Sequence, residues 1–211
     1  MATMIKYTNT DFEEITQQQV SKSKEYHKET YENGELKLIQ KYWMKGRNVE
    51  TSYNGGEYYL SLDENLEDII NQYLPIGISW FFYYNKVTNA NNDEKWEYQF
   101  FHKGILDRKG VEVYNKNGEL LASCIKDLLT NDIKEKRKYF YGDLNIFKRI
   151  DYKYPYYTFN YEDNGIDTIF VHDEDYRLNE FLASNEMSIF PWNDHSYYHD
   201  FEPLLPTGLN I

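Results

Sequence analysis

Two Asn-Gly pairs, each between strand-forming segments, constrain the fold of this chain more than any other feature. Asn117-Gly118 separates residues 111–114 from residues 120–124, and both segments are rich in residues that favour β-strands. Both members of such a pair tolerate a positive φ, which the tightest hairpin turns require. The pattern recurs at Asn33-Gly34 and, more loosely, at residues 53–58 and 161–166. The sequence therefore predicts two-residue turns at both Asn-Gly pairs and a fold built from antiparallel hairpins.

Helices are expected only in short stretches. Ser61 and Glu64 have the spacing of a capping box, and apolar residues at helical intervals follow before Pro75. This pattern predicts one amphipathic helix that covers a face of the sheet. The remaining candidates for short helices are residues 10–20, 126–138 and 176–183.

Two adjacent glycines after the Asn33-Gly34 hairpin indicate a further turn. Asn54-Gly55-Gly56 predicts a turn between strands at residues 49–53 and 57–62, and residues 45–48 predict another before them. Together these patterns predict a mainly β (α+β) protein, with a single domain over residues 1–211. We expect an antiparallel sheet of stacked hairpins with one or two covering helices. A hairpin body at about residues 21–160 would precede an acidic, aromatic-rich part at 161–211.

The composition adds constraints on compartment and on membrane contact. Aromatic residues make up 18% of the 211 residues, which favours a sheet. Cys124 is the only cysteine, so no intrachain disulfide is possible, as is typical of a reducing compartment. Residues 1–31 are polar, and the longest apolar stretch, residues 76–84, is too short to span a bilayer. We therefore expect a cytoplasmic protein without membrane contact, whose oligomeric state the sequence leaves open.

The negative charge of the chain is concentrated near its C-terminus. The formal net charge is −12. Residues 154–211 contain 11 acidic residues and one basic residue, Arg177, whereas acids and bases nearly balance in the first 153 residues. Such an asymmetry is typical of a surface that interacts with an oppositely charged partner, although a solvated surface that only aids solubility is the alternative.

Aromatic residues are interleaved with these carboxylates, including Tyr161, Phe170 and Phe181. Aromatic anchors supply contact area in protein interfaces, and charges around them steer association. We therefore interpret this part of the chain as a binding face for a basic protein. The predicted partner-binding residues are Asp163, Asp167, Asp173, Glu174, Asp175, Trp192, Asp194, Tyr197 and Asp200.

Catalytic and metal-binding patterns are weak in comparison. His195 and His199 have a spacing that would place both on one face of a helix, but Pro191 and Pro203 flank them closely. Cys124 lies in a predicted strand, where an inert buried thiol is expected, although His102 could serve as its base. Phosphate-binding glycine loops and the nucleophile-elbow motif are absent from the sequence. We expect no catalytic residue, no metal ligand and no cofactor.

Part of the chain resembles a known family. Residues 77–84, with the pattern G-x-x-W-x-x-Y-Y, and residues 110–120, which read G-V-E-V-Y-N-K-N-G-E-L, are similar to the MORN-like repeats of YwqK-type bacterial antitoxins. Residues 26–43 look similar, so the resemblance covers roughly residues 25–125. It implies a sheet of stacked hairpins in a bacterial protein that binds another protein, as immunity proteins of polymorphic toxins do.

These observations favour a non-catalytic inhibitor. The expected function is that of a bacterial immunity protein or antitoxin that neutralises a basic toxin such as a nuclease, because an acidic inhibitor suits an active site that attracts phosphate. Direct nucleic-acid binding is disfavoured, since phosphates would be repelled. Two alternatives remain open: a phage-encoded acidic protein that mimics nucleic acid to inhibit a host defence protein, and an enzyme that uses the carboxylates or histidines of residues 172–202.

Overall fold

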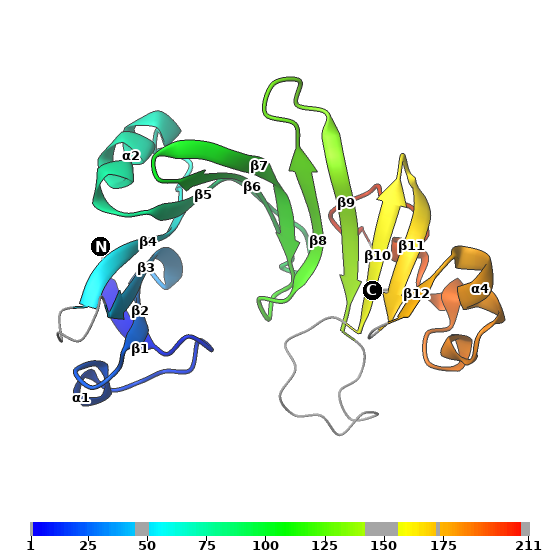
Figure 1. The fold of residues 1–211 in the computed structure, drawn as a ribbon, viewed down its shortest axis with the longest axis horizontal. Helices are drawn as coiled ribbons and strands as arrows, with labels where there is room; N and C mark the ends of the chain where they lie inside the picture. The colour runs from blue at the N-terminus through cyan, green and yellow to red at the C-terminus, as the bar shows by residue number, and fades with distance from the viewer. Residues whose placement is uncertain (1, 45–50, 142–155, 172–173, 208–211) are drawn as a thin grey trace. The chain divides into compact units, whose positions relative to one another are not determined.

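The computed structural model describes residues 2–44, 51–141, 156–171 and 174–207, which form a mainly β protein (Figure 1). Twelve strands are hydrogen-bonded in the order of the sequence, so each strand lies beside the next one along the chain. The sheet is mostly antiparallel, as the hairpin pattern predicts, but β4 and β5 pair in parallel. The strands are β1 (Thr3–Thr8), β2 (Glu25–Glu32), β3 (Glu35–Met44), β4 (Thr51–Tyr59), β5 (Ser79–Thr88), β6 (Glu94–His102), β7 (Ile105–Tyr114), β8 (Leu120–Lys126), β9 (Ile133–Phe140), β10 (Tyr157–Glu162), β11 (Gly165–Val171) and β12 (Glu174–Tyr176).

Helical segments are short in the described ranges. The α-helices are α1 (Gln17–Val20), α2 (Leu66–Tyr73) and α4 (Leu178–Ala183). The 3-10 turns are η1 (Leu74–Ile76), η2 (Asn185–Ser188), η3 (Trp192–Asp194) and η4 (Ser196–Tyr198). The helix expected at residues 176–183 is thus confirmed as α4, whereas the one expected at residues 10–20 is reduced to the single turn of α1, capped by Thr16. The turn predicted at residues 45–48 lies outside the described residues.

The chain divides into two compact units. Unit 1 comprises residues 1–85 and 98–109, and unit 2 comprises residues 86–97 and 110–211. Strands β1 to β4 belong to unit 1 and β8 to β12 to unit 2, while β5, β6 and β7 contribute residues to both. The acidic part of the chain from residue 161 onward therefore belongs to unit 2.

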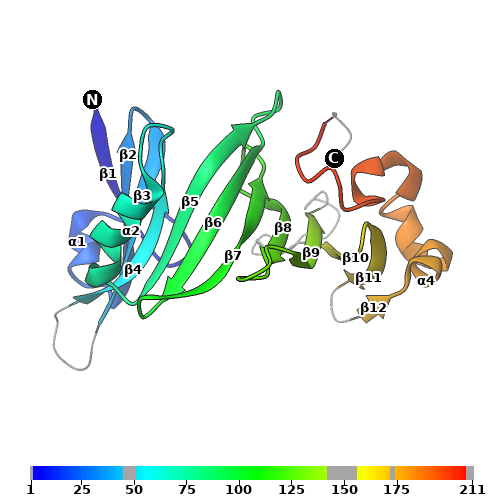
Figure 2. The same ribbon diagram turned by 90° about the horizontal axis from the view of Figure 1, so that it is seen from above.

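Helix α2 covers one face of the sheet in unit 1, and the two views of Figures 1 and 2 agree on its place beside β4 and β5. Its apolar residues Leu66, Ile69 and Ile70 pack against a core that contains Trp80 and Phe82, both fully buried. Periodic apolar residues on a helix next to a hydrophobic sheet face give this arrangement, as the sequence predicts.

The start of α2 differs from the predicted capping box. Asn65 caps the helix, because its side chain accepts hydrogen bonds from the backbone N–H groups of Glu67 at 2.9 Å and Asp68 at 3.2 Å. Ser61 is not the cap. Only half of the expected box forms, since the Glu64 carboxylate accepts from the Ser61 N–H at 2.7 Å.

The turn predicted at Asn54-Gly55-Gly56 does not form, because β4 runs through these residues without a break. The glycines serve a close approach instead. A Cβ atom at Gly55, where φ is +131°, would lie 1.8 Å from the carbonyl oxygen of Ser79, the residue paired with it on β5. The glycines therefore let β5 lie in parallel beside β4, at a point where the pairing with β3 also shifts register.

The two Asn-Gly pairs form different turns. Asn33-Gly34 makes the predicted two-residue turn, with φ values of 52° and 90° between the paired residues Glu32 and Glu35. At the second pair the hairpin is confirmed, but its two-residue turn is wrong: the loop contains residues 116–118, and the N–H of Asn115 donates to the carbonyl of Glu119 at 2.9 Å. Only the last loop residue, Gly118, has a positive φ. Three-residue hairpin loops of this kind place glycine at the left-handed position.

An asparagine side chain orders this loop and two others. Asn115 Oδ1 accepts from the N–H groups of Asn117 at 2.9 Å and Glu119 at 3.0 Å. Its amide also donates to the Glu119 carboxylate at 2.6 Å. The same device, an asparagine followed four residues later by an acid, closes the loops Asn9 to Glu13 and Asn89 to Asp93.

The helix expected at residues 126–138 does not form: Lys126 ends β8, residues 127–132 are a loop, and residues 133–138 belong to β9. Strand β9 pairs with β8 on one side and β10 on the other, with Ala122 opposite Lys138 and Phe159 also opposite Lys138. The ladder of backbone hydrogen bonds on both sides outweighs the local helical preference of its lysines and glutamate.

Aromatic side chains form the core of unit 2. Phe159, Phe181 and Phe190 are fully buried, and Tyr198 and Phe201 are 1% and 2% exposed. The rings meet mostly edge to face or tilted, the arrangements that aromatic pairs prefer. Helix α4 and the irregular segment that follows it supply four of these five rings, so the C-terminal part of the chain is packed onto β10 and β11 (Figure 1).

Candidate functional site

Burial accounts for most aromatic residues of the acidic segment. Tyr161, Phe181, Tyr197, Tyr198 and Phe201 are all at most 8% exposed and belong to the core of unit 2. Among the eight rings interleaved with the carboxylates, the less buried ones are Phe170, Tyr176 and Trp192. The rings therefore hold the segment together, and the carboxylates are the feature that the segment presents to solvent.

Two predicted residues, Asp163 and Asp167, lie together at the β10–β11 hairpin. They line an open depression of about 450 Å³ with Glu162, Leu178 and other residues of the hairpin and α4. Asp163 lies in the turn with a φ of 52°. The Asp167 carboxylate accepts from the Thr168 hydroxyl at 2.7 Å and pairs with the guanidinium of Arg177.

These two contacts set the charge state of Asp167. The hydrogen bond from Thr168 and the contact with Arg177 lower the pKa of this carboxyl below its usual value. The carboxylate therefore stays ionised at neutral pH, and Arg177 partly neutralises it. Asp163 remains exposed beside it.

Glu174 and Asp175 lie on β12. Their register partners on β11 are Val171 and Phe170, and both carboxylates are exposed. The Tyr176 hydroxyl donates to Glu174 at 2.5 Å. In the order of the described strands, β12 is at the edge of the sheet. An edge strand has a neighbouring strand on one side only, so these side chains are accessible. Asp173 lies outside the described residues.

The remaining predicted residues lie in the irregular segment after α4. Asp194 and Asp200 are exposed. Trp192 is half-buried, and its ring stacks on His199 with centroids 4.4 Å apart. Tyr197 is buried, and its hydroxyl donates to the Leu204 carbonyl at 2.6 Å, so this ring supports the segment from inside.

The structure thus arranges the carboxylates in three groups: the β10–β11 hairpin, β12 and the segment after α4. Within residues 156–171 and 174–207, Arg177 and Asp167 form the only ion pair. We refer to these carboxylates as the acidic surface; its members are Glu162, Asp163, Asp167, Glu174, Asp175, Asp194 and Asp200.

Lys138 binds the backbone of the segment that carries Asp200. The sequence analysis did not identify this residue. Its side chain is fully buried on β9, and its ammonium donates to the backbone carbonyls of Tyr197 at 2.6 Å, Asp200 at 2.8 Å and Pro203 at 3.1 Å. It also lies 3.7 Å from the centroid of the Tyr197 ring. The ammonium therefore joins β9 to the part of the chain that carries Asp200.

Burial lowers the pKa of Lys138 to about 7, while the nearby carboxylates of Glu202 and Asp200 act in the opposite direction. A buried ammonium is tolerated only when acceptors surround it, and here three carbonyls do so. The only sequence signal was the alternation of lysines at positions 134, 136 and 138, which fits a strand as well as a charged helix.

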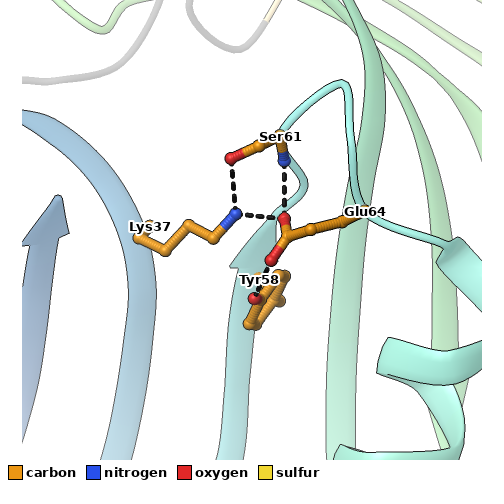
Figure 3. Close-up of polar contacts among 4 residues, drawn as sticks. All are labelled: Lys37, Tyr58, Ser61 and Glu64. Atoms are coloured by element: carbon orange, nitrogen blue, oxygen red, sulfur yellow. Dashed lines mark hydrogen bonds and ion pairs between the residues drawn. The ribbon is translucent and has the colours of Figure 1, made fainter. Parts of the chain in front are cut away.

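Figure 3 shows a second polar cluster, in unit 1. The Lys37 ammonium on β3 donates to the Ser61 hydroxyl at 2.8 Å and pairs with the Glu64 carboxylate. The Tyr58 hydroxyl donates to the same carboxylate at 2.7 Å. A serine beside a lysine can form a nucleophile and its base, but the Glu64 carboxylate pairs with the amino group of this lysine. The cluster joins the loop before α2 to β3, which is a structural role.

The histidines expected as weak metal candidates pack on separate rings. His195 stacks on Phe190 with centroids 4.2 Å apart, and burial lowers the pKa of its imidazole. His199 stacks on Trp192, and its Nε2 atom is 2.8 Å from the Trp192 carbonyl oxygen. Within the described part of the chain, no group of three or more His, Cys, Asp or Glu residues is placed to hold a metal ion.

Cys124 lies on β8 with 1% of its surface exposed, and burial raises the pKa of its thiol. A raised pKa lowers the fraction of reactive thiolate. His102, considered as its base, hydrogen-bonds the Ser79 hydroxyl through Nδ1 at 3.0 Å.

Comparisons with protein-family models, with curated proteins and with solved structures find no match to this chain. The resemblance of residues 25–125 to MORN-like repeats therefore stays a prediction. None of the helices in the described ranges is both long enough and apolar enough to cross a bilayer.

Proposed function

We propose that this protein is a non-catalytic inhibitor that binds a basic partner protein through the acidic surface. A bacterial immunity protein or antitoxin that neutralises a basic toxin, such as a nuclease, has this design. The observation that supports the proposal most directly is the scarcity of ion pairs on this surface: Arg177 is the single base in residues 154–211, and in the described part of that range its guanidinium forms an ion pair only with Asp167.

The charges and the rigid support beneath them have different roles. Unpaired carboxylates create a negative potential that attracts a basic surface and raises the association rate. The aromatic core and Lys138 hold the backbone beneath Asp194 and Asp200 in place, so less conformational freedom is lost on binding. Inhibition then follows from covering the partner's basic site.

The test combines capture with an activity measurement. The full chain is immobilised and exposed to extract of its source organism, in parallel with a variant carrying Glu174→Gln, Asp175→Asn and Asp194→Asn. We expect a basic protein that the unmodified chain retains and the variant retains poorly. Its activity should fall in proportion to added inhibitor until a one-to-one or other fixed ratio is reached.

A control variant keeps the change in net charge and moves its position. Asp63→Asn, Glu67→Gln and Asp68→Asn remove three exposed charges from unit 1. Equal loss of binding in both variants would mean that only overall charge matters. Retention of no basic protein, or undiminished activity of a retained one, would contradict the proposal. Displacement of the partner by DNA would favour nucleic-acid mimicry as the form of the inhibition.

A further inference from the structure

The β8–β9 loop, residues 127–132, presents apolar side chains at the tip of a hairpin. Leu129 is 93% exposed, and Leu128 beside it is 39% exposed. Ile133, the first residue of β9, is 37% exposed. An exposed leucine is ordinary when it stands alone, but here three apolar side chains lie within six residues of one hairpin end.

Hydrogen bonds fix the backbone of this loop. Asp127 Oδ1 accepts from the N–H groups of Leu129 at 2.7 Å and Thr130 at 2.9 Å. The Asp127 N–H donates to the Asp132 carbonyl at 2.7 Å, which closes the loop. The other carboxylate oxygen pairs with the Lys134 ammonium at 2.6 Å, and these contacts lower the pKa of the Asp127 carboxyl. The leucine is therefore held on an ordered loop.

The geometry of the loop does not require leucine. Three other loops, each one residue shorter, begin with an asparagine whose Oδ1 atom also accepts from the N–H two residues further on, and the two positions after it are occupied by Thr10-Asp11, Ala90-Asn91 and Lys116-Asn117. Polar or small residues fill these positions there. The leucine pair in the β8–β9 loop is thus an addition to the loop's own structural needs.

This loop lies at the same end of the unit 2 sheet as part of the acidic surface. Strands β8 to β11 alternate in direction, which places the β8–β9 loop and the β10–β11 turn at one end, as Figure 1 shows. The Lys136 ammonium on β9 donates to the backbone carbonyl of Asp163 in that turn, which ties the two hairpins together. Asp132 adds an exposed carboxylate in the loop itself.

We propose that Leu129 is an anchor that inserts into an apolar pocket on the basic partner protein, with Leu128 against the pocket rim. This inference rests on the proposed function and names a second component of the same interface. An ordered loop loses little conformational freedom on binding, and protein interfaces commonly have an apolar core surrounded by a polar rim. The neighbouring carboxylates of Asp132 and Asp163 would face basic side chains around that pocket.

The test compares two leucines of equal exposure. Leu129→Ser and Leu62→Ser both replace an almost fully exposed leucine, and Leu62 lies in unit 1. The dissociation constant and rate constants are measured for each variant with the basic protein retained in the capture experiment. Leu129→Ser should weaken binding by roughly ten- to a hundredfold, mainly through faster dissociation, because burying a leucine stabilises a complex to that extent. Leu62→Ser should bind as the unmodified chain does.

The failures of the two proposals are distinguishable. If the charge-neutralised variant binds poorly while Leu129→Ser binds normally, the acidic surface stands and the anchor is wrong. An equal loss for Leu129→Ser and Leu62→Ser also overturns the anchor. Retention of no basic protein at all contradicts the proposed function and the anchor with it. Both serine variants should unfold at the same denaturant concentration as the unmodified chain, because their side chains are exposed.

Discussion

Lys138→Met tests how the C-terminal segment is held on the sheet. The substitution keeps most of the apolar stem, which lies among aromatic rings, and removes the ammonium. The backbone carbonyls of Tyr197, Asp200 and Pro203 then lose the hydrogen bonds that the lysine side chain donates to them. An acceptor left without a partner in a buried site costs about 1 kcal/mol or more. Three of them give an expected loss of about 3 kcal/mol in the free energy of unfolding at pH 7.

The same structure predicts a dependence on pH. Lysine in an unfolded chain has a pKa of about 10.4, and burial lowers the pKa of Lys138 to about 7 in the fold. Between these values the unfolded chain binds more protons, so the stability of the unmodified protein rises as pH increases. The rise from pH 7 to pH 9 is about 2 kcal/mol for this group alone. It should be absent in Lys138→Met, which makes the difference between the two proteins larger at pH 9.

Urea unfolding of both proteins at pH 6, 7 and 9 measures this difference. Lys134→Met, on the same strand but 62% exposed in its side chain, is the matched control, and it should cost less than about 1 kcal/mol because its ion pair is on the surface. Hydrogen exchange of residues 194–207 should be faster in Lys138→Met than in the control. A difference between Lys138→Met and the unmodified protein that is small at every pH would refute the reasoning that the Lys138 amino group holds this segment.

Three further predictions concern the interior. Gly55→Ala should lower the free energy of unfolding by more than about 3 kcal/mol or abolish folding, since its Cβ would overlap the β5 backbone. Gly118→Ala should lower it by only about 1 kcal/mol, because nothing lies within 4 Å of the added Cβ, and equal urea midpoints for the two variants would contradict this. Glu64→Gln should cost about 3 kcal/mol by leaving the buried Lys37 ammonium without its counter-charge, and thermal unfolding that is unchanged would be the opposite result. Cys124 should react slowly with a thiol reagent in the folded protein and quickly in urea, and fast reaction without urea would show the thiol to be accessible.

The turns show how far local sequence determines local structure. The pairs at positions 33–34 and 117–118 are both Asn-Gly, yet they form turns of different length. The residue two positions before the second pair is Asn115, whose side chain closes a longer loop, whereas Tyr31 at the equivalent position before the first pair cannot accept those hydrogen bonds. This difference could be predicted from Asn115 alone, because a glutamate follows both Asn-Gly pairs, at Glu35 and Glu119.

Other features depend on parts of the chain that are far apart in sequence. The glycines of β4 are typical of a turn, and only the parallel approach of β5 explains their use in a strand. Lys138 is buried because a segment about sixty residues later covers it, which no local pattern indicates. The acidic surface was visible as a charge asymmetry, but the rings among its carboxylates proved to be mainly core, because a strand or a short turn exposes some side chains and buries their neighbours.

The most direct test of the central claim is the association rate of the protein with its basic partner at low and high salt. If the acidic surface steers the encounter, the variant with Glu174→Gln, Asp175→Asn and Asp194→Asn should associate roughly tenfold more slowly at low salt and show a weaker salt dependence. Its dissociation rate should change little, and the unit 1 variant of equal charge should associate as the unmodified protein does. An unchanged association rate in the first variant would contradict the account, because these carboxylates would then serve only to solvate the surface.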